Sequence, residues 1–364
     1  MNNFTDPQMT EKETIKDLLS EISFHALNAL VPQLKDGTYT RLSLGKVEYF
    51  SITAFLYARE GVLGDSGYIH NPANKYCEYL DRIDAEFHEI WDLVLKQNRD
   101  EVIESLRKLR SRNDLQESSD EAWEFFMGWW NKSRENGAFV QPYEVTELML
   151  GLLDYKGGRV YNPFAGFASF GRELEIGDNY TGEEIFQPAY VMGLVNLLIH
   201  NCSPKNYSLA DSLKNSSEEL FDYYIASLPL GLKVDSSYLD ALSDKYSSKV
   251  DINDYALLSS VKKLKENGKS VILCSSNILS SSRSLATRRY LVEQNLLDMV
   301  VYLPAGIFKT TGISTVLVVL RKGREKSEKI RFVDAIENYV YDNKLIASTL
   351  LRNILKIKNP RLSL

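Results

Sequence analysis

The sequence predicts an α/β protein with a doubly wound, mostly parallel sheet and a helical N-terminal domain. Three observations lead to this fold class. Short apolar segments alternate with helical patterns from Gly158 onward, the preceding hundred-odd residues have helical periodicity, and a glycine-containing turn at Gly166 follows the first predicted strand. Strands that alternate with helices form parallel sheets, and the ligands of such sheets bind beyond the carboxyl ends of the strands.

The N-terminal part reads as a set of helices. Apolar residues recur there at spacings of three and four, which places them on one face of a helix. They are Ile15, Leu18, Leu19 and Ile22, then Phe87, Ile90 and Leu93, and then Val102, Leu106 and Leu109. An irregular stretch with Gly61, Gly64, Gly67 and Pro72 separates helical pieces.

A polar linker closes this first region. It covers residues 113–119, and Ser118 with Glu121 forms a capping box that would open the next helix. We therefore predict a helical domain over 1–118, a catalytic-fold domain over 119–335 and a C-terminal helical tail over 336–364.

The central region supplies the predicted strands. Each is a short run rich in β-branched or aromatic residues. They are Arg159–Tyr161, Asn179–Glu183, Tyr207–Ala210, Tyr223–Ala226, Ser270–Cys274, Met299–Leu303 and Val316–Leu320. Among the helices between them, Leu257, Val261 and Leu264 share one face, with Gly268 as the predicted stop.

Composition narrows the class of protein. The chain has 364 residues and a net charge of −6, which argues against binding nucleic acid over the whole surface. No apolar run is long enough to span a bilayer, and the polar start is not a signal peptide. Three cysteines and four histidines are scattered, so a disulfide framework or a thiolate zinc site is not indicated. We expect a cytoplasmic, metal-free protein.

Two groups of basic residues remain as local patches. Arg283, Arg288, Arg289 and Lys309 would lie near the ligand-binding edge of the sheet. A second run comprises Arg321, Lys322, Arg324, Lys326, Lys329 and Arg331, interrupted by Glu325 and Glu328. Either group could contact a polyanion, and the second could equally be a solvated hairpin with charged flanks.

Two turns carry the candidate chemistry. The segment Val160–Phe170 reads as a strand, a small-residue turn around Gly166 and the start of a helix. The segment Phe221–Gly231 is a second strand that ends in the turn Ser227-Leu228-Pro229-Leu230. A glycine lets the backbone approach a nucleotide-type ligand, and a polar residue on a nearby strand end is where chemistry would be placed.

These segments resemble the adenine-specific DNA methyltransferases, most closely the modification subunit of type I restriction–modification systems. Four further segments agree in the same order: Gly137–Leu153, Tyr180–Ile185, Leu209–Leu213 and Leu303–Val316. The resemblance covers roughly residues 120–335. It implies a Rossmann-like sheet that uses S-adenosylmethionine, DNA as substrate, and specificity or restriction subunits as partners.

The resemblance also implies a set of cofactor-binding residues. The methionine end of S-adenosylmethionine would lie against Val140, Gln141 and Pro142. The first turn would contribute Asn162, Phe164, Ala165 and Gly166. Glu184 would bind the ribose and Asp211 the adenine. Glu183 would point away from Glu184 on the strand, and Asp211 could instead cap the next turn.

The first turn departs from the family pattern in three places. Asn162 replaces an aspartate, Phe167 replaces a small residue and could fill the pocket, and Ala168 replaces a glycine. Alanine is tolerated at that position if its φ is negative.

The second turn departs further. The family reads Asn-Pro-Pro-Phe/Tyr where this chain has Ser227, Leu228, Pro229 and Leu230. Ser227 retains an acceptor oxygen and Leu228 a carbonyl, but leucine at 230 cannot stack on a flipped base. Phe308 or Tyr223 could stack instead. We expect methyl transfer to be impaired or absent.

Three functions stay open from the sequence. The first is a DNA adenine-N6 methyltransferase subunit that is active within a complex. The second is an inactive scaffold or DNA-binding subunit with the same fold, or a regulatory protein in phage defence. The third is methylation of a protein glutamine or an RNA base, against which the length of the match argues.

Overall fold

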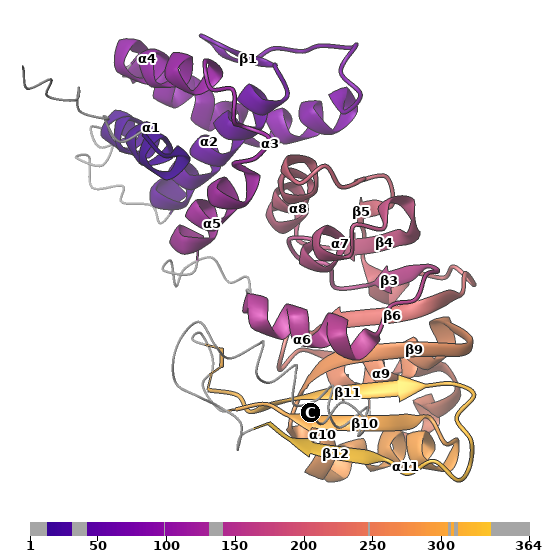
Figure 1. The fold of residues 1–364 in the computed structure, drawn as a ribbon. Helices are drawn as coiled ribbons and strands as arrows, with labels where there is room; N and C mark the ends of the chain where they lie inside the picture. The colour runs from indigo at the N-terminus through magenta and orange to yellow at the C-terminus, as the bar shows by residue number, and fades with distance from the viewer. Residues whose placement is uncertain are drawn as a thin grey trace, which may run out of the picture. The chain divides into compact units, whose positions relative to one another are not determined.

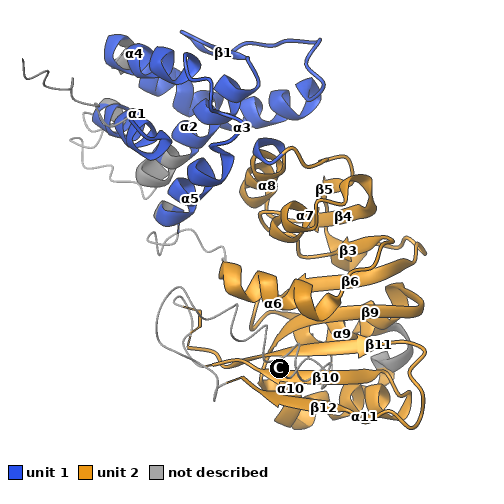
Figure 2. Cartoon of the chain, in the orientation of Figure 1, with its two compact units in different colours: residues 1–137, 198–200 blue, residues 138–197, 201–364 orange. Residues whose placement is uncertain are grey.

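The computed structural model describes residues 13–30, 42–97, 99–130, 141–246, 248–304, 307–308 and 312–335. Val140, Lys309 and the predicted tail 336–364 lie outside the described residues. The chain divides into two compact units (Figure 2). Unit 1 comprises residues 1–137 and 198–200, and unit 2 comprises residues 138–197 and 201–364.

Unit 1 is helical, as predicted. Its described helices are α1 (Ile15–Leu30), α2 (Leu42–Arg59), α3 (Cys77–Gln97), α4 (Arg99–Arg110) and α5 (Ser119–Trp130). The apolar face of α1 is fully buried, since the predicted residues Ile15, Leu18, Leu19 and Ile22 have no exposed surface. Aromatic rings fill much of this core, for example Phe50 against Trp91 with ring centroids 4.3 Å apart.

Two features of unit 1 differ from the sequence-based expectation. A small hairpin of β1 (Leu63–Gly64) and β2 (Gly67–Tyr68) lies inside the glycine-rich stretch. The division between units falls after residue 137, whereas the predicted boundary was residue 118. The difference is α5, which packs on α1 and α2, so its apolar face buries within unit 1.

Unit 2 is built on an eight-stranded sheet (Figure 1). The spatial order is β12-β10-β11-β9-β6-β3-β4-β5, and all pairings are parallel except the two made by β11. The strands are β3 (Val160–Asn162), β4 (Tyr180–Glu184), β5 (Tyr207–Leu209), β6 (Phe221–Ser227), β9 (Leu264–Ser275), β10 (Leu297–Tyr302), β11 (Thr315–Arg321) and β12 (Arg331–Asp334). The predicted doubly wound, mostly parallel sheet is confirmed.

Helices cover both faces of this sheet (Figure 1). On one face lie α6 (Tyr143–Leu153) and α7 (Ser169–Leu174), and α8 (Gln187–Ile199) flanks β4 and β5. On the other face lie α9 (Ile252–Lys263), α10 (Asn277–Ser280) and α11 (Leu285–Glu293). Alternate residues of β6 and of the second half of β9 therefore enter two separate cores, which explains the apolar runs Tyr223–Ala226 and Val271–Cys274.

Several local predictions need correction. Helix α9 ends at Lys263, and Leu264 already belongs to β9. Gly268 is therefore not a helix stop but lies within a bulged stretch of β9, where Asn267 has a φ of +64°. The small hairpin of β7 (Lys233–Asp235) and β8 (Lys249–Asp251), and the edge strand β12, were not predicted. Each has only three or four residues, too few to show a two-residue period.

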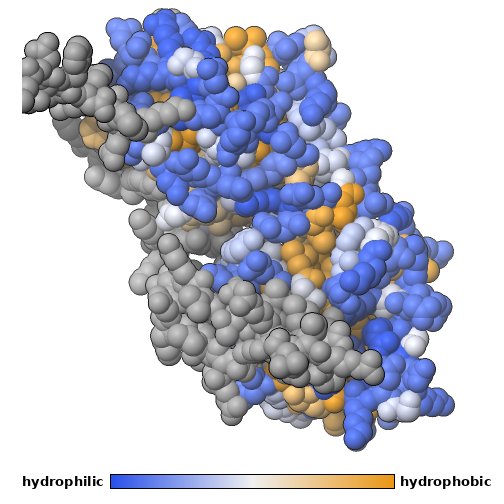
Figure 3. All heavy atoms as spheres, viewed as in Figure 1, coloured by the Kyte–Doolittle hydropathy of each residue, from blue (hydrophilic) through white to orange (hydrophobic). Residues whose placement is uncertain are grey.

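The described surface seen in Figure 3 is mainly hydrophilic, with hydrophobic residues in small groups. Among the described residues, no helix combines the length and the apolar character that crossing a membrane would require.

Candidate functional site

The candidate site lies where the order of the strands reverses. The chain passes from β3 outward to β4 and β5 and then returns to place β6 on the other side of β3. Ligands of open α/β sheets bind at such a switch point, beyond the carboxyl ends of the strands. Glu184 and Ser227 are the last residues of β4 and β6, and Gly166 and Asp211 lie in the segments after β3 and β5, so the topology gathers these predicted residues along one edge.

The turn after β3 is held in place by hydrogen bonds from three directions. The N–H of Ala165 donates to the Glu183 carbonyl at 2.9 Å. The Tyr207 hydroxyl donates to the Gly166 carbonyl at 2.6 Å, and the Asn196 amide donates to the Phe167 carbonyl at 2.7 Å. The conformation of the turn is therefore set by its neighbours.

The backbone conformation at position 166 favours glycine. Its φ is +52°, and a Cβ built there would meet no described heavy atom within 4 Å beyond the adjacent residues. Ala168 has a φ of +56°, so the condition of a negative φ is not met and the alanine occupies the left-handed region that favours glycine. The side chain of Phe167 is buried.

Glu184 binds the same turn through its carboxylate. Its Oε2 accepts from the Gly166 N–H at 2.9 Å, and its Oε1 accepts from the Phe186 N–H at 2.7 Å. Each carboxylate oxygen offers two lone-pair directions, so both oxygens keep capacity for a ligand hydroxyl.

The neighbouring residue Glu183 points into the opposite core, as predicted. Its carboxylate accepts from the Tyr161 hydroxyl at 2.6 Å and from the Asn215 amide at 2.5 Å. The Lys263 ammonium lies beside this group and donates to the Asn215 side-chain oxygen at 3.3 Å. Burial, together with the charge of Glu183, raises the pKa of Tyr161. These side chains connect β3, β4 and α9 beneath the turn. None of them is among the site residues predicted from the sequence.

Asp211 and Asn162 serve the local backbone. The Asp211 carboxylate accepts from the Leu213 N–H at 3.1 Å and thereby caps a short 3-10 helix, which was the competing prediction for this residue. Asn162 is fully buried, donates to the Tyr180 hydroxyl at 3.0 Å and accepts from the Phe164 N–H at 3.4 Å. Asn162 thus shapes the turn and offers no exposed atom to a ligand.

Ser227 ends β6 next to the turn of β3. Tyr224 pairs with Tyr161, so Ser227 lies three residues further along β6, level with the segment that follows Asn162. Its Oγ is buried and has no hydrogen-bond partner among the described residues. A buried hydroxyl without a partner costs about 1–3 kcal/mol, so this atom is a plausible acceptor or donor for a ligand group.

The rest of the second turn is apolar. Leu228 is fully buried, and Leu230 packs against the same hydrophobic cluster, while Pro229 is exposed. Phe308 is also buried, in the core beneath α6, so it does not present a ring to a flipped base in this structure. No aromatic ring therefore takes the place that the family's Phe/Tyr would occupy within residues 227–230.

Other buried polar side-chain atoms without a hydrogen-bond partner among the described residues include Gln141 Oε1, just before α6, and Thr315 Oγ1, at the start of β11. Gln141 was a predicted cofactor residue. Thr315 is not among the predicted site residues, although it lies in the segment Leu303–Val316 that contributes to the resemblance.

The basic residues are used largely for structure. Arg288 donates to the carbonyls of Ile278 and Ser281 at 2.9 and 2.7 Å. Asp298, which is buried, binds Arg331 at 2.7 Å and lies 3.5 Å from Arg324. Strand β11 runs antiparallel to β9 and ends at Arg321, the first residue of the second basic run. That run therefore lies at the edge of the sheet opposite Ser227.

Comparison with known proteins gives the following relatives. Residues 116–359 match the family model "N-6 DNA Methylase". The methylase subunit of the type I restriction enzyme MpnII from Mycoplasma pneumoniae is 27% identical over 260 residues, which is 62% of this chain and 48% of that protein. The MjaVIII methylase subunit from Methanocaldococcus jannaschii is 24% identical over 282 residues, 68% of this chain and 48% of that protein. The chain thus spans about half the length of these curated relatives.

Solved structures agree on the fold. A type I restriction–modification methyltransferase subunit from Streptococcus thermophilus superposes with a TM-score of 0.66 at 17% identity, covering 97% of this chain and 94% of the other. A class I S-adenosylmethionine-dependent methyltransferase from Listeria monocytogenes, itself described as putative, gives 0.65 at 12% identity and covers 95% and 98%. The sheet and the helices around it therefore have the methyltransferase architecture.

Proposed function

Because this chain belongs to the N-6 DNA methylase family, we propose that it is the modification-type subunit of a type I restriction–modification-like system. In this proposal the subunit binds S-adenosylmethionine and methylates adenine N6 in DNA slowly. The single observation that carries the proposal is the position of Ser227. Its hydroxyl lies buried at the carboxyl end of β6, beside the Gly166 turn, with no hydrogen-bond partner in the part of the chain that the structure describes. DNA and the specificity or restriction subunits are the proposed partners.

The residues present fit S-adenosylmethionine. Glu184 has acceptor capacity for the ribose hydroxyls, and the space in front of Gly166 is open. Ile185 and Leu209 expose apolar surface at the ends of β4 and β5, which suits the adenine ring. Gln141 Oε1 can accept from the ammonium group of the methionine moiety, and the N-terminal N–H groups of α6 favour its carboxylate. When bound, the cofactor supplies an electrophilic methyl group.

The task of the protein is then to position the adenine amino group. Ser227 Oγ can accept a hydrogen bond from that nitrogen and orient its lone pair. Leu228 can contribute its carbonyl, since Pro229 favours an extended backbone at the preceding residue. Leu230 offers contact area but no aromatic face, and a lost base–aromatic stack weakens base binding by about 1–3 kcal/mol. This loss is the reason to propose slow transfer.

A second candidate function is a non-catalytic scaffold or DNA-binding subunit with the same fold. The observation that favours it is the packing of Leu228 and Leu230 in the hydrophobic cluster, where the family has residues that face the base.

Two measurements test the proposal. Calorimetric titration of the full chain with S-adenosylmethionine is expected to give one site of micromolar affinity. Sequencing of host DNA with and without the gene is expected to show adenine-N6 methylation that depends on it. No binding at millimolar cofactor would refute the cofactor site.

Binding without methylation would favour the scaffold, and Leu230→Phe sharpens the distinction. If Ser227 positions a base, the added ring should raise methylation by roughly 5- to 150-fold, the equivalent of one stacking interaction. If the chain is a scaffold, the Leu230→Phe variant should be as inactive as the parent.

A further inference from the structure

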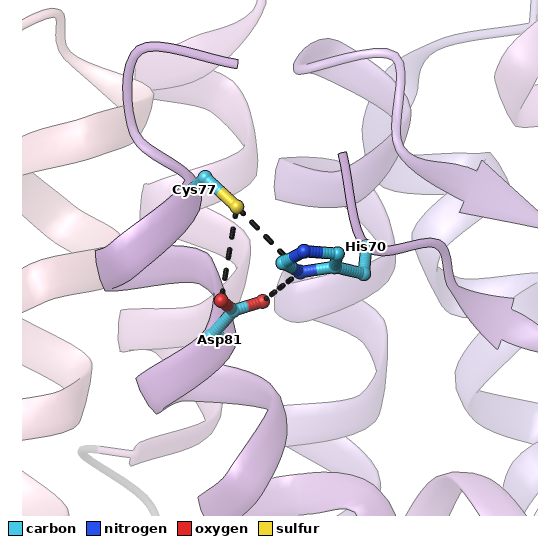
Figure 4. Close-up of side chains that lie close together, drawn as sticks. All are labelled: His70, Cys77 and Asp81. Carbon is cyan, nitrogen blue, oxygen red and sulfur yellow. Dashed lines mark hydrogen bonds and ion pairs between the residues drawn. The ribbon is translucent and has the colours of Figure 1, made fainter. Parts of the chain in front are cut away.

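Three side chains of types that commonly bind metal ions lie close together in unit 1. The Gly166 and Ser227 turns belong to unit 2, so this cluster is separate from the site described above. The three side chains are His70, on the segment after β2, and Cys77 and Asp81, in the first two turns of α3. Figure 4 shows the thiol and the carboxylate both directed toward the imidazole ring. The Cys77 Sγ lies 3.6 Å from His70 Nδ1 and 3.7 Å from Asp81 Oδ2. His70 Nδ1 lies 2.9 Å from Asp81 Oδ1.

These separations match those around a tetrahedral zinc ion. Zinc lies about 2.3 Å from thiolate sulfur and about 2.0–2.1 Å from imidazole nitrogen or carboxylate oxygen. At tetrahedral angles, such lengths place the ligand atoms about 3.3–3.6 Å apart. Of the three observed distances, 3.6 Å is at the upper end of that range, 3.7 Å is just above it and 2.9 Å is below it, so side-chain shifts of a few tenths of an ångström would complete the geometry.

We propose that His70, Cys77 and Asp81 bind one zinc ion, with water at the fourth position. One sulfur, one nitrogen and one oxygen ligand make a donor set that zinc accepts and that calcium and magnesium, which prefer oxygen, do not. The imidazole and the carboxylate are partly exposed, with side-chain exposures of 61% and 43%, so the ion and its water can reach the site from solvent.

The backbone already holds the three ligands in place. Cys77 and Asp81 are four residues apart on α3, which puts them on one face of the helix. Asn74 fixes the segment before α3: its amide donates to the Glu60 carbonyl at 3.2 Å, and its side-chain oxygen accepts from the Tyr76 N–H at 2.7 Å. Little loop ordering would therefore oppose binding of the ion.

An outer partner is present as well. The Tyr68 hydroxyl donates to Asp81 Oδ1 at 2.7 Å and so orients the carboxylate. Residues that orient a metal ligand in this way typically contribute 10- to 100-fold in metal affinity, as an order of magnitude. The zinc ion would connect the β1–β2 segment to α3, which makes it a structural clamp of unit 1 and independent of the proposed methyl transfer.

The test uses the full chain, freed of metal with a chelator and titrated with Co²⁺ as a spectroscopic probe. The expected result is one Co²⁺ per chain, a thiolate-to-cobalt absorption band in the near ultraviolet, and loss of the band when Zn²⁺ is added. Zinc should also raise the melting temperature, because a ligand that binds only the folded state stabilises it.

Variants separate the clamp from a simple hydrogen-bonded cluster. Cys77→Ser should abolish the absorption band, and His70→Gln should weaken binding at least ~10-fold, while Tyr68→Phe should weaken it by about 10- to 100-fold. His88→Gln and Asp92→Asn change exposed residues of the same helix and should bind Co²⁺ like the parent. Far-ultraviolet circular dichroism establishes that each variant is folded. A parent chain without the band, or a band that survives Cys77→Ser, would overturn the proposal.

Discussion

The carboxylate of Glu184 accepts a hydrogen bond of 2.9 Å from the backbone N–H of Gly166. This bond joins the end of β4 to the turn after β3, so the residue proposed to bind the ribose also fixes the turn proposed to accommodate the cofactor. A substitution at Glu184 should therefore weaken cofactor binding more than it destabilises the fold.

Replacing Glu184 with alanine should weaken S-adenosylmethionine binding. Hydrogen bonds to a charged group contribute about 1.5–3 kcal/mol, so the dissociation constant should rise roughly 10- to 150-fold in a calorimetric titration. Glu218→Ala, an exposed glutamate outside the site, is the control and should bind like the parent. An unchanged affinity for Glu184→Ala would show that the ribose is held by other residues.

Ser227→Ala should lower the methylation rate but raise the stability of the fold. The Ser227 Oγ has no partner among the described residues, so its removal should raise the free energy of unfolding by about 1 kcal/mol in urea denaturation. Loss of the positioning acceptor should lower the methylation rate by about 10²-fold with unchanged cofactor affinity. Ser282→Ala, an exposed serine, should change neither quantity. A lower stability would mean that the hydroxyl has a structural partner.

Gly158→Ala should destabilise the protein more than Gly157→Ala. Both glycines have positive φ values, +110° and +103°, so alanine is strained at either position by about 1 kcal/mol. Only at Gly158 would the new Cβ also lie 2.6 Å from the Asp222 carboxylate, whereas at Gly157 it meets no described atom within 4 Å. Equal unfolding free energies for the two variants would contradict this account, and Gly158→Ala should cost less when it is made in an Asp222→Ala background than in the parent.

The Asp222 carboxylate should make the free energy of unfolding depend on pH. Burial acts to raise the pKa of Asp222, but the Arg159 N–H bond and the Lys265 ammonium outweigh it and lower the pKa below its usual value. A lowered pKa in the folded state contributes stability above the unfolded pKa of about 3.9 and loses it as the pH falls through the folded pKa.

Asp222→Asn should therefore be less stable than the parent at neutral pH and should converge with it at low pH. Thermal unfolding measured from pH 7 down to pH 3 checks this. A difference that stays constant over that range would show that the charge of Asp222 does not contribute.

Asp298→Ala should cost about 3–5 kcal/mol of unfolding free energy, because removal of one partner from a buried ion pair leaves its guanidinium groups uncompensated. Arg324 and Arg331 both contact this carboxylate. Asp178→Ala removes an exposed pair with Lys205 and should cost about 1 kcal/mol or less. Similar costs for the two variants would argue against the buried network.

The sequence allowed the sheet to be predicted because its central strands contain short runs that are apolar on both faces, such as Tyr223–Ala226 of β6 and Val271–Cys274 of β9. The edge of the site could also be predicted, since Gly166, Glu184 and Ser227 each follow a recognisable strand. The end of α9 could not, because Leu264 continues the helical spacing of Leu257 and Val261 although it pairs with Phe221 in the sheet. Here a tertiary pairing overrides the local pattern.

Contacts between distant residues were the other limit. Asp298 and Arg331 are 33 positions apart, and nothing in the local composition distinguishes this pair from surface charges. The grouping of His70 with Cys77 and Asp81 depends on where the segment after β2 folds back, and only three dimensions show it. A glycine-rich stretch predicts an interruption of helix but not its path.

Strand β11 runs against both of its neighbours, so Thr315 and Arg321 lie at opposite ends of the sheet. Six residues of extended chain span about 20 Å. The Asp298 network and the proposed methyl-transfer edge are thus separated by most of the length of a strand. An engineer could reinforce one end for heat tolerance while redesigning the other for a new substrate, with little crosstalk between the two.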